Sequence, residues 1–193
     1  MKADEATEHL EKAAEPDSDN KGLAIYIAVL AVMLAIAALG GSNAAKDMAN
    51  ENIMASDKWN FYQAKNLRQT QYRISAEALE LEMKSRPDMP AEARAAYQEK
   101  IAAYRAAVAR YDSEPETGEG KKELLAKAKE HEAARDLAGE RDPWFDAAES
   151  ALQIAIVLAS VSAIVGLPAL TWISGVLAIV GVLTTANGYL LLM

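Results

Sequence analysis

GLAIYIAVLAVMLAIAALGGSNAA, residues Gly22–Ala45, is the first of three stretches in this chain that contain no charged side chain. The other two stretches are Ser150–Leu167 and Ala169–Met193. An uncharged, mainly apolar run of about 18 or more residues is long enough to cross a lipid bilayer as an α-helix. We therefore predict a membrane protein with three transmembrane helices.

The boundaries of the predicted parts follow from where the charges begin and end. An acidic N-terminal tail covers residues 1–21, and the three transmembrane helices cover residues 22–41, 148–167 and 169–192. Residues 42–147, which lie between the first two spans, are dense in charge and are predicted to lie outside the membrane.

The insert is predicted to be helical, with two breaks. No Pro or Gly interrupts Ser42–Arg86, so the first span should continue out of the bilayer as one helix. The segment Arg86–Pro90 then breaks the helix with two prolines, and DSEPETGEG at Asp112–Gly120 is a loop by composition. A third helix follows, which Gly139 and Asp142-Pro143 should end before the second span.

The outgoing helix and the two returning helices contain about the same number of residues. An antiparallel arrangement requires equal lengths, because the chain leaves and re-enters the membrane at the same face. The predicted fold is therefore an all-α membrane protein with three transmembrane helices. A long extramembrane antiparallel helical hairpin, a coiled-coil-like stalk, is inserted between the first and second spans. A compact three-helix domain is the alternative for the insert.

The seam of this stalk is predicted from residues spaced by alternating steps of three and four, or by seven. The returning arm contributes Tyr97, Ile101, Tyr104 and Val108. The outgoing helix contributes Leu67, Ile74 and Leu81.

Each predicted span carries a ridge of small residues, which allow helix backbones to approach closely in lipid. The first ridge is Ala24, Ala28, Ala31, Ala35 and Ala38. The second is Ala151, Ala155, Ala159, Ser162 and Gly166, and the third is Ser174, Ala178, Gly181, Thr185 and Gly188. Two ridges can pack against each other within one chain and leave the third for a partner. This counting favours a homo-oligomer or a subunit of a membrane protein complex.

Two further groups are candidates for contacts. Asn187 is a polar amide at membrane depth, where it should bond a neighbouring helix or line a pore. Trp59 and Tyr62 follow the first span on the same predicted helix. They are candidates for docking a partner, or for packing against the returning arm.

Composition excludes several functions. The chain has no Cys and two His residues, His9 and His131, which lie far apart in the sequence. We find no catalytic motif, no cofactor-binding motif and no metal-ligand spacing, so no enzymatic activity is predicted. The net charge of -8 argues against a nucleic-acid partner. Lys46, Arg135 and Arg141 favour a cytoplasmic insert by the positive-inside rule.

ASDKWNFYQAK at Ala55–Lys65 and FDAAESALQIAIVLAS at Phe145–Ser160 resemble a family of bacterial membrane proteins. This family is catalogued as a domain of unknown function (the four-three-three-seven type), and the resemblance covers nearly the whole chain. It implies a bacterial inner-membrane location and three spans, and it brings no activity with it. The uncharged turn at Gly166–Leu170 departs from the basic, aromatic turn of other members.

Taken together, these features predict a non-enzymatic integral membrane protein. It would act as a homo-oligomeric scaffold or as an accessory subunit of a membrane complex, with the lipid bilayer as its other partner. The alternative is an oligomeric channel or pore that is lined by the third transmembrane helix, with Asn187 facing inward.

Overall fold

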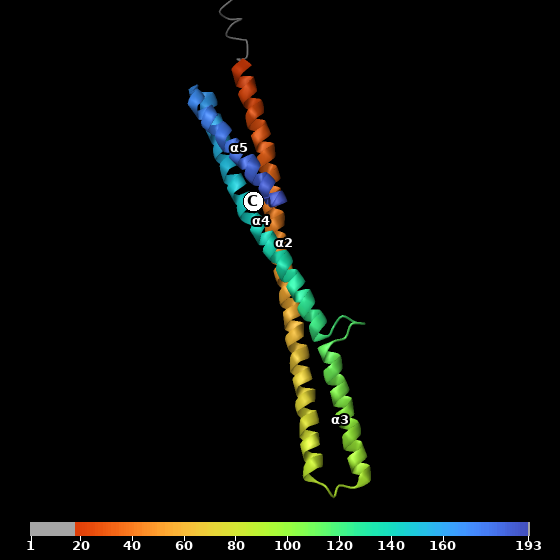
Figure 1. Cartoon of the computed structure of the whole chain (residues 1–193). Coiled ribbons are helices and arrows are strands. Elements are labelled where there is room, and N and C mark those ends of the chain that lie inside the picture. The colour runs from red at the N-terminus through yellow and green to blue at the C-terminus, as the bar shows by residue number, and fades with distance from the viewer. Residues whose placement is uncertain (1–17, 193) are drawn as a thin grey trace, which may run out of the picture. The chain divides into compact units, whose positions relative to one another are not determined.

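The structure, a computed structural model, describes residues 18–192, and these form four helices and no strand. The helices are α2 (Ser18–Ser85), α3 (Ala91–Asp112), α4 (Lys121–Val165) and α5 (Pro168–Leu190) (Figure 1). Nearly all of the predicted tail at residues 1–21 lies outside the described residues. The predicted all-helical class is confirmed for the part of the chain that is described.

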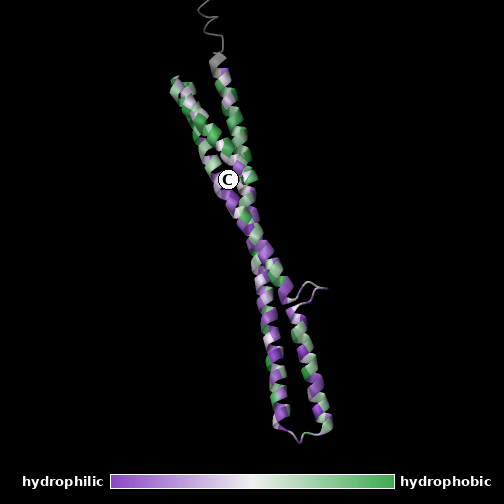
Figure 2. Ribbon diagram, viewed as in Figure 1, coloured by the Kyte–Doolittle hydropathy of each residue, from purple (hydrophilic) through white to green (hydrophobic). Residues whose placement is uncertain are grey.

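The helices form two compact units. We call Met1–Lys46 with Leu137–Met193 the apolar unit, and Asp47–Asp136 the charged unit. Hydrophobic residues dominate the helices of the apolar unit, whereas hydrophilic residues dominate those of the charged unit (Figure 2). Three helices, α2, α4 and α5, are long and apolar enough to cross a membrane.

The unbroken helix predicted from the first apolar stretch to Arg86 is confirmed by α2, which spans 68 residues. Pro87 and Pro90 explain its end, because proline cannot continue the hydrogen-bond ladder and also disfavours a helical residue before it. Pro90 then precedes α3 with φ -52° and ψ 143°, and Glu92 lies in the first turn of that helix.

The helix end predicted at Pro143 is wrong, because α4 runs through this proline as one helix of 45 residues. Proline inside a helix removes one hydrogen bond, here to the carbonyl of Gly139, and costs about 3 kcal/mol. The helix survives because the residues that follow are anchored by packing. Phe145 is only 2% exposed and Ala148 is fully buried.

The turn between α4 and α5 agrees with the predicted stop and restart. Gly166 has φ 68°, in the left-handed region that glycine adopts without steric cost, and its N–H donates to the Ser162 carbonyl at 2.9 Å. Pro168 opens α5 at the position where its missing N–H costs nothing.

The core of the apolar unit is built mainly from alanine and leucine. Its buried cluster contains Leu30 and Ala37 from α2, Ala178 from α5, and Ala148, Leu152 and Ala155 from α4. Small side chains at these positions allow the three helices to approach each other closely. This close approach forms the packing surfaces between α2, α4 and α5.

Candidate functional site

Residues 18–192 contain no group of three or more His, Asp or Glu residues that could hold a metal ion. His131 contacts Glu51 through its Nδ1 atom at 2.6 Å, and His9 lies outside the described residues. The candidate functional surfaces are therefore the faces by which the helices pack or are left exposed.

In the apolar unit, the small-residue ridges of α4 and α5 are buried. Ala151, Ala155, Ala159 and Ser162 are buried on α4, whereas Gly166 is exposed. All five predicted ridge residues of α5 are buried: Ser174, Ala178, Gly181, Thr185 and Gly188. A Cβ atom at Gly181 would lie 2.6 Å from Cγ of Leu152, which shows how closely α5 approaches α4.

Ser174 links the three helices of the apolar unit through hydrogen bonds. Its hydroxyl donates to the Ala155 carbonyl on α4 at 2.7 Å. Because its proton is used there, the hydroxyl of Tyr26 on α2 is the donor in the 3.0 Å bond to Ser174 Oγ. The hydrogen-bond chain from the half-buried Tyr26 to the fully buried Ser174 and Ala155 therefore joins α2, α5 and α4.

We expect Ser174→Ala to destabilise the apolar unit by about 1 kcal/mol, because interhelical hydrogen bonds in membrane proteins have this order of magnitude. Tyr26→Phe should cost less, since it removes only one of the two bonds. The measurement is reversible unfolding of the purified protein in mixed detergent micelles, followed by circular dichroism. Thr184→Ala is a suitable control, because the Thr184 hydroxyl bonds only within α5.

Phe145 lies in a socket formed by glycines. A Cβ atom at Gly40 on α2 would overlap the Phe145 ring, and one at Gly188 on α5 would lie 2.8 Å from it. Tyr189 packs against the same ring edge to face, with 4.9 Å between the ring centroids. The sequence interpretation did not identify Gly40. The Gly-Gly pair at 40–41 was the available indication, since a helical glycine often marks a close approach.

Of the three predicted ridges, the one on the first span is largely left exposed by the other helices of the described chain. Ala24, Ala28, Ala31 and Ala35 are exposed and Ala38 is half-buried. The buried face of α2 instead carries Leu30, Ala37, Gly40, Gly41 and Ala44. The physical reason is the Phe145 ring, which fits only against a residue without a Cβ atom, so the glycines rather than the alanine ridge turn toward α4.

Asn187 is 2% exposed and lies at the C-terminal end of α5. Its Oδ1 atom accepts a hydrogen bond from the N–H of Leu192 at 2.9 Å, while its carbonyl accepts from the N–H of Leu191 at 2.7 Å. Asn187 therefore accepts hydrogen bonds from two backbone N–H groups just beyond the helix end, and one of these bonds pairs a carbonyl of the last helical turn.

An open groove of about 1040 Å³ lies at the other end of the apolar unit. Its lining includes Gly22 and Tyr26 of α2 together with Trp172 and Gly175 of α5. A Cβ atom at Gly22 or Gly175 would meet no other atom within 4 Å. These two glycines are therefore in open space, unlike Gly40 and Gly188.

In the charged unit, α3 packs against α2 through tyrosines. The ring of Tyr72 lies 5.4 Å from that of Tyr104 and is stacked 5.8 Å from that of Tyr111. Gln69 Nε2 donates to the Val108 carbonyl at 2.9 Å, and Ile101 is 7% exposed. Tyr97 is half-buried, and a hydrogen bond to the Glu82 carboxylate raises the pKa of its hydroxyl.

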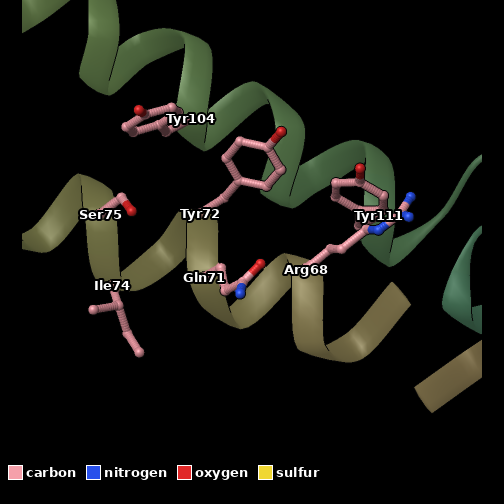
Figure 3. Close-up of a pocket in the computed structure, with 7 residues that line it drawn as sticks. All are labelled: Arg68, Gln71, Tyr72, Ile74, Ser75, Tyr104 and Tyr111. Atoms are coloured by element: carbon pink, nitrogen blue, oxygen red, sulfur yellow. The ribbon is translucent and has the colours of Figure 1, made fainter. Parts of the chain in front are cut away.

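The four predicted seam residues of α3 are thus buried or half-buried, whereas the three predicted on α2 are not. Leu67, Ile74 and Leu81 are 62%, 59% and 69% exposed. Figure 3 shows Ile74 pointing away from α3, while Tyr72 points toward it. The observed seam on α2 lies two residues to either side of Leu67 and Ile74, at Lys65, Gln69, Tyr72 and Ala76, because the tyrosine rings fill the space between the helices.

A shallow groove of about 640 Å³ runs beside this tyrosine cluster. Five residues of α2 and two of α3 line it: Arg68, Gln71, Tyr72, Ile74, Ser75, Tyr104 and Tyr111 (Figure 3). Lys65 lies nearby and is only 8% exposed; its Nζ atom is 5.3 Å from the centroid of Tyr111 and 3.4 Å from Glu119 Oε2.

Trp59 and Tyr62, the predicted docking residues, are half-buried in contacts within the charged unit. Trp59 Nε1 donates to Glu132 Oε1 on α4 at 2.8 Å, and Lys121 Nζ lies 5.6 Å from the Tyr62 ring centroid. These contacts favour the hypothesis that Trp59 and Tyr62 pack against the returning helix over the hypothesis that they dock a partner.

The loop between α3 and α4 is held by carboxylates. Glu123 accepts from Ser113 Oγ at 2.6 Å and from the N–H of Glu114 at 3.1 Å, and these bonds lower the pKa of its carboxyl. Lys122 bonds Asp112 at 3.1 Å and lowers the pKa of that carboxyl. Both carboxylates are half-buried and lie at the surface, where ion pairs contribute little, so these contacts order the loop more than they stabilise the unit.

Comparison with known proteins gives one family. Residues 19–191 match the model of a family described as "Domain of unknown function (DUF4337)". Neither the comparison with curated proteins nor the comparison with solved structures gave a match.

Proposed function

We propose that this chain, which belongs to the DUF4337 family, is a non-enzymatic multi-pass protein of the bacterial inner membrane that acts as a homo-oligomeric scaffold. The apolar unit lies in the bilayer, and the charged unit forms an antiparallel helical stalk outside the bilayer. Lys46, Arg135 and Arg141 favour the cytoplasmic side for the stalk.

The outward surface of the apolar unit supports its place in the bilayer. Large apolar side chains point outward on all three helices, as for Ile25 at 66%, Ile164 at 86% and Val176 at 61% exposure. A soluble monomer rarely exposes a large continuous apolar surface to water. Surrounding acyl chains would remove this cost, and the helical form of the three spans pairs backbone groups within each helix, as lipid requires.

The oligomer proposal rests on a difference in burial between the three ridges. The ridges on α4 and α5 are buried, whereas Ala24, Ala28, Ala31 and Ala35 on α2 face outward. In lipid, a ridge of small residues offers a second helix close van der Waals contact that a bulkier face does not. A second copy of the chain would provide the same ridge on its own α2.

Size measurement in mild detergent tests this proposal. We expect the purified protein to run as an oligomer, and Ala31→Leu to reduce it to a single chain because the added side chain holds the two helices apart. Val32→Leu is the matched control: Val32 is 60% exposed and is not part of the ridge. A wild-type protein that is monomeric in detergent and in native membranes would contradict the proposal.

Purification of the tagged protein from its native membrane separates the scaffold from the accessory subunit. A second protein in fixed ratio would place the chain in a larger complex, whereas recovery of the chain alone supports self-assembly. The channel alternative gains no support from Asn187, because its side chain is buried within the chain and its oxygen accepts from Leu192.

A further inference from the structure

Outside the apolar unit, α2 exposes a second face that none of residues 18–192 buries. We call it the heptad face, and all of its members are exposed: Ala64, Leu67, Gln71, Ile74, Ala78 and Leu81. The three large residues are spaced by seven, and the other three lie at the intervening positions. This is the a/d pattern by which two helices pack knobs into holes.

We propose that the heptad face pairs with the same face of a second copy, so that the two α2 helices form a parallel, in-register coiled coil. This inference rests on the proposed function, because it is the shared membrane that fixes both copies in the same direction. Parallel pairing in register places Leu67, Ile74 and Leu81 each opposite its counterpart.

The area of the heptad face indicates which kind of partner can bind it. The heptad face is about 27 Å long at 1.5 Å per residue and about 10 Å wide, so it offers roughly 300 Å² per copy. A stable interface in water buries about 800 Å² per partner. The heptad face alone is therefore too small to capture a freely diffusing protein, whereas a copy already held by the same membrane is present at high effective concentration.

Gln71 supports pairing with an identical helix. A polar side chain at an a position of a coiled coil fixes register and oligomer state, because it is satisfied only opposite a matching polar group. In the parallel pair, Gln71 meets a second Gln71, and each amide can both donate and accept.

Charge does not drive this pairing. Glu77 and Glu82 flank the heptad face, and the parallel arrangement brings Glu77 of one copy near Glu82 of the other. Glu82 is partly compensated by Arg86, whose Nη2 lies 3.2 Å from Glu82 Oε1. The association should therefore persist when salt is raised, because salt screens repulsion between the glutamates and leaves the apolar contact intact.

Single cysteines test the pairing directly, because the natural chain contains none. In native membranes oxidised with copper–phenanthroline, Ile74→Cys should give a disulfide-linked dimer, since paired d positions come within disulfide range. Arg73→Cys is the matched control: it lies one residue away on an exposed side of the same helix. We expect roughly tenfold more dimer for Ile74→Cys.

Register is tested by Leu67→Cys and Leu81→Cys. Both should cross-link in a parallel pair, whereas an antiparallel pair centred on Ile74 would link neither and would overturn the inference. Equal cross-linking of Ile74→Cys and Arg73→Cys would mean random collision and would also overturn it.

The two proposals fail in distinguishable ways. If no position of the heptad face cross-links while the protein remains an oligomer in detergent, the stalk pairing is wrong and the membrane scaffold stands. If the protein is also a single chain in detergent and in native membranes, both proposals fall.

Discussion

Gly40→Ala should destabilise the apolar unit by about 2 kcal/mol, although alanine is normally the better helix former. Its Cβ atom would overlap the buried Phe145 ring, which is 2% exposed and enclosed by α2, α4 and α5. Overpacking of a close-packed core costs about 1 to 3 kcal/mol, and direct overlap with a buried ring belongs at the upper end of this range. The intrinsic gain of alanine over glycine in a helix, about 1 kcal/mol, opposes this cost without removing it.

The chain supplies matched controls for this effect. Gly22→Ala on α2 and Gly175→Ala on α5 place a methyl group in open space, so each should be neutral or slightly stabilising. Gly188→Ala should be destabilising, because Gly188 contacts the same ring from α5. The readout for all four variants is the free energy of unfolding in mixed detergent micelles.

A double variant tests whether the Phe145 ring is the cause. Phe145→Leu makes room near Gly40, so Gly40→Ala should cost at least about 1 kcal/mol less in that background than in the natural chain. If Gly40→Ala and Gly22→Ala have the same stability, the glycine socket around Phe145 is wrong.

Helix boundaries were the part of the fold that local chemistry could predict. Pro87 and Pro90 end α2 and precede α3, and Gly166 with Pro168 makes the turn before α5, because these residues restrict the backbone whatever surrounds them. Pro143 shows the limit of this reasoning. The rule that proline ends a helix predicts a break there. The packing of Phe145 and Ala148, which follow Pro143 in α4, outweighs the loss of one hydrogen bond.

The choice of helix face was less predictable, since α2 is long enough to carry several regularly spaced stripes. Periodicity identified the α4 and α5 ridges, which are buried, and also the alanine ridge of α2, which is not. Which stripe turns inward depends on the shape of the neighbouring helix. The Phe145 ring packs against the glycines of α2. Because Phe145 is far from α2 in the sequence, the periodicity of α2 does not indicate this contact.

The second large effect is expected in the charged unit. Ile101→Asp should destabilise this unit by about 3 kcal/mol. Ile101 on α3 is 7% exposed, so the change removes buried apolar area and forces a carboxylate toward a poorly hydrated position. Limited proteolysis and amide hydrogen exchange across Asp47–Asp136 provide the measurement, because both report local opening.

Ile74→Asp distinguishes the observed seam from the one predicted by sequence spacing. Ile74 is 59% exposed, so in the detergent-dissociated single chain this variant should leave the exchange of α3 unchanged, although it should weaken pairing between copies. Ala102→Asp controls for an added charge on α3, since Ala102 is exposed, and should cost less than about 1 kcal/mol. If Ile74→Asp opens the single chain as much as Ile101→Asp does, then Leu67, Ile74 and Leu81 belong to the intrachain seam. The heptad face would in that case be occupied within one chain and unavailable to a second copy.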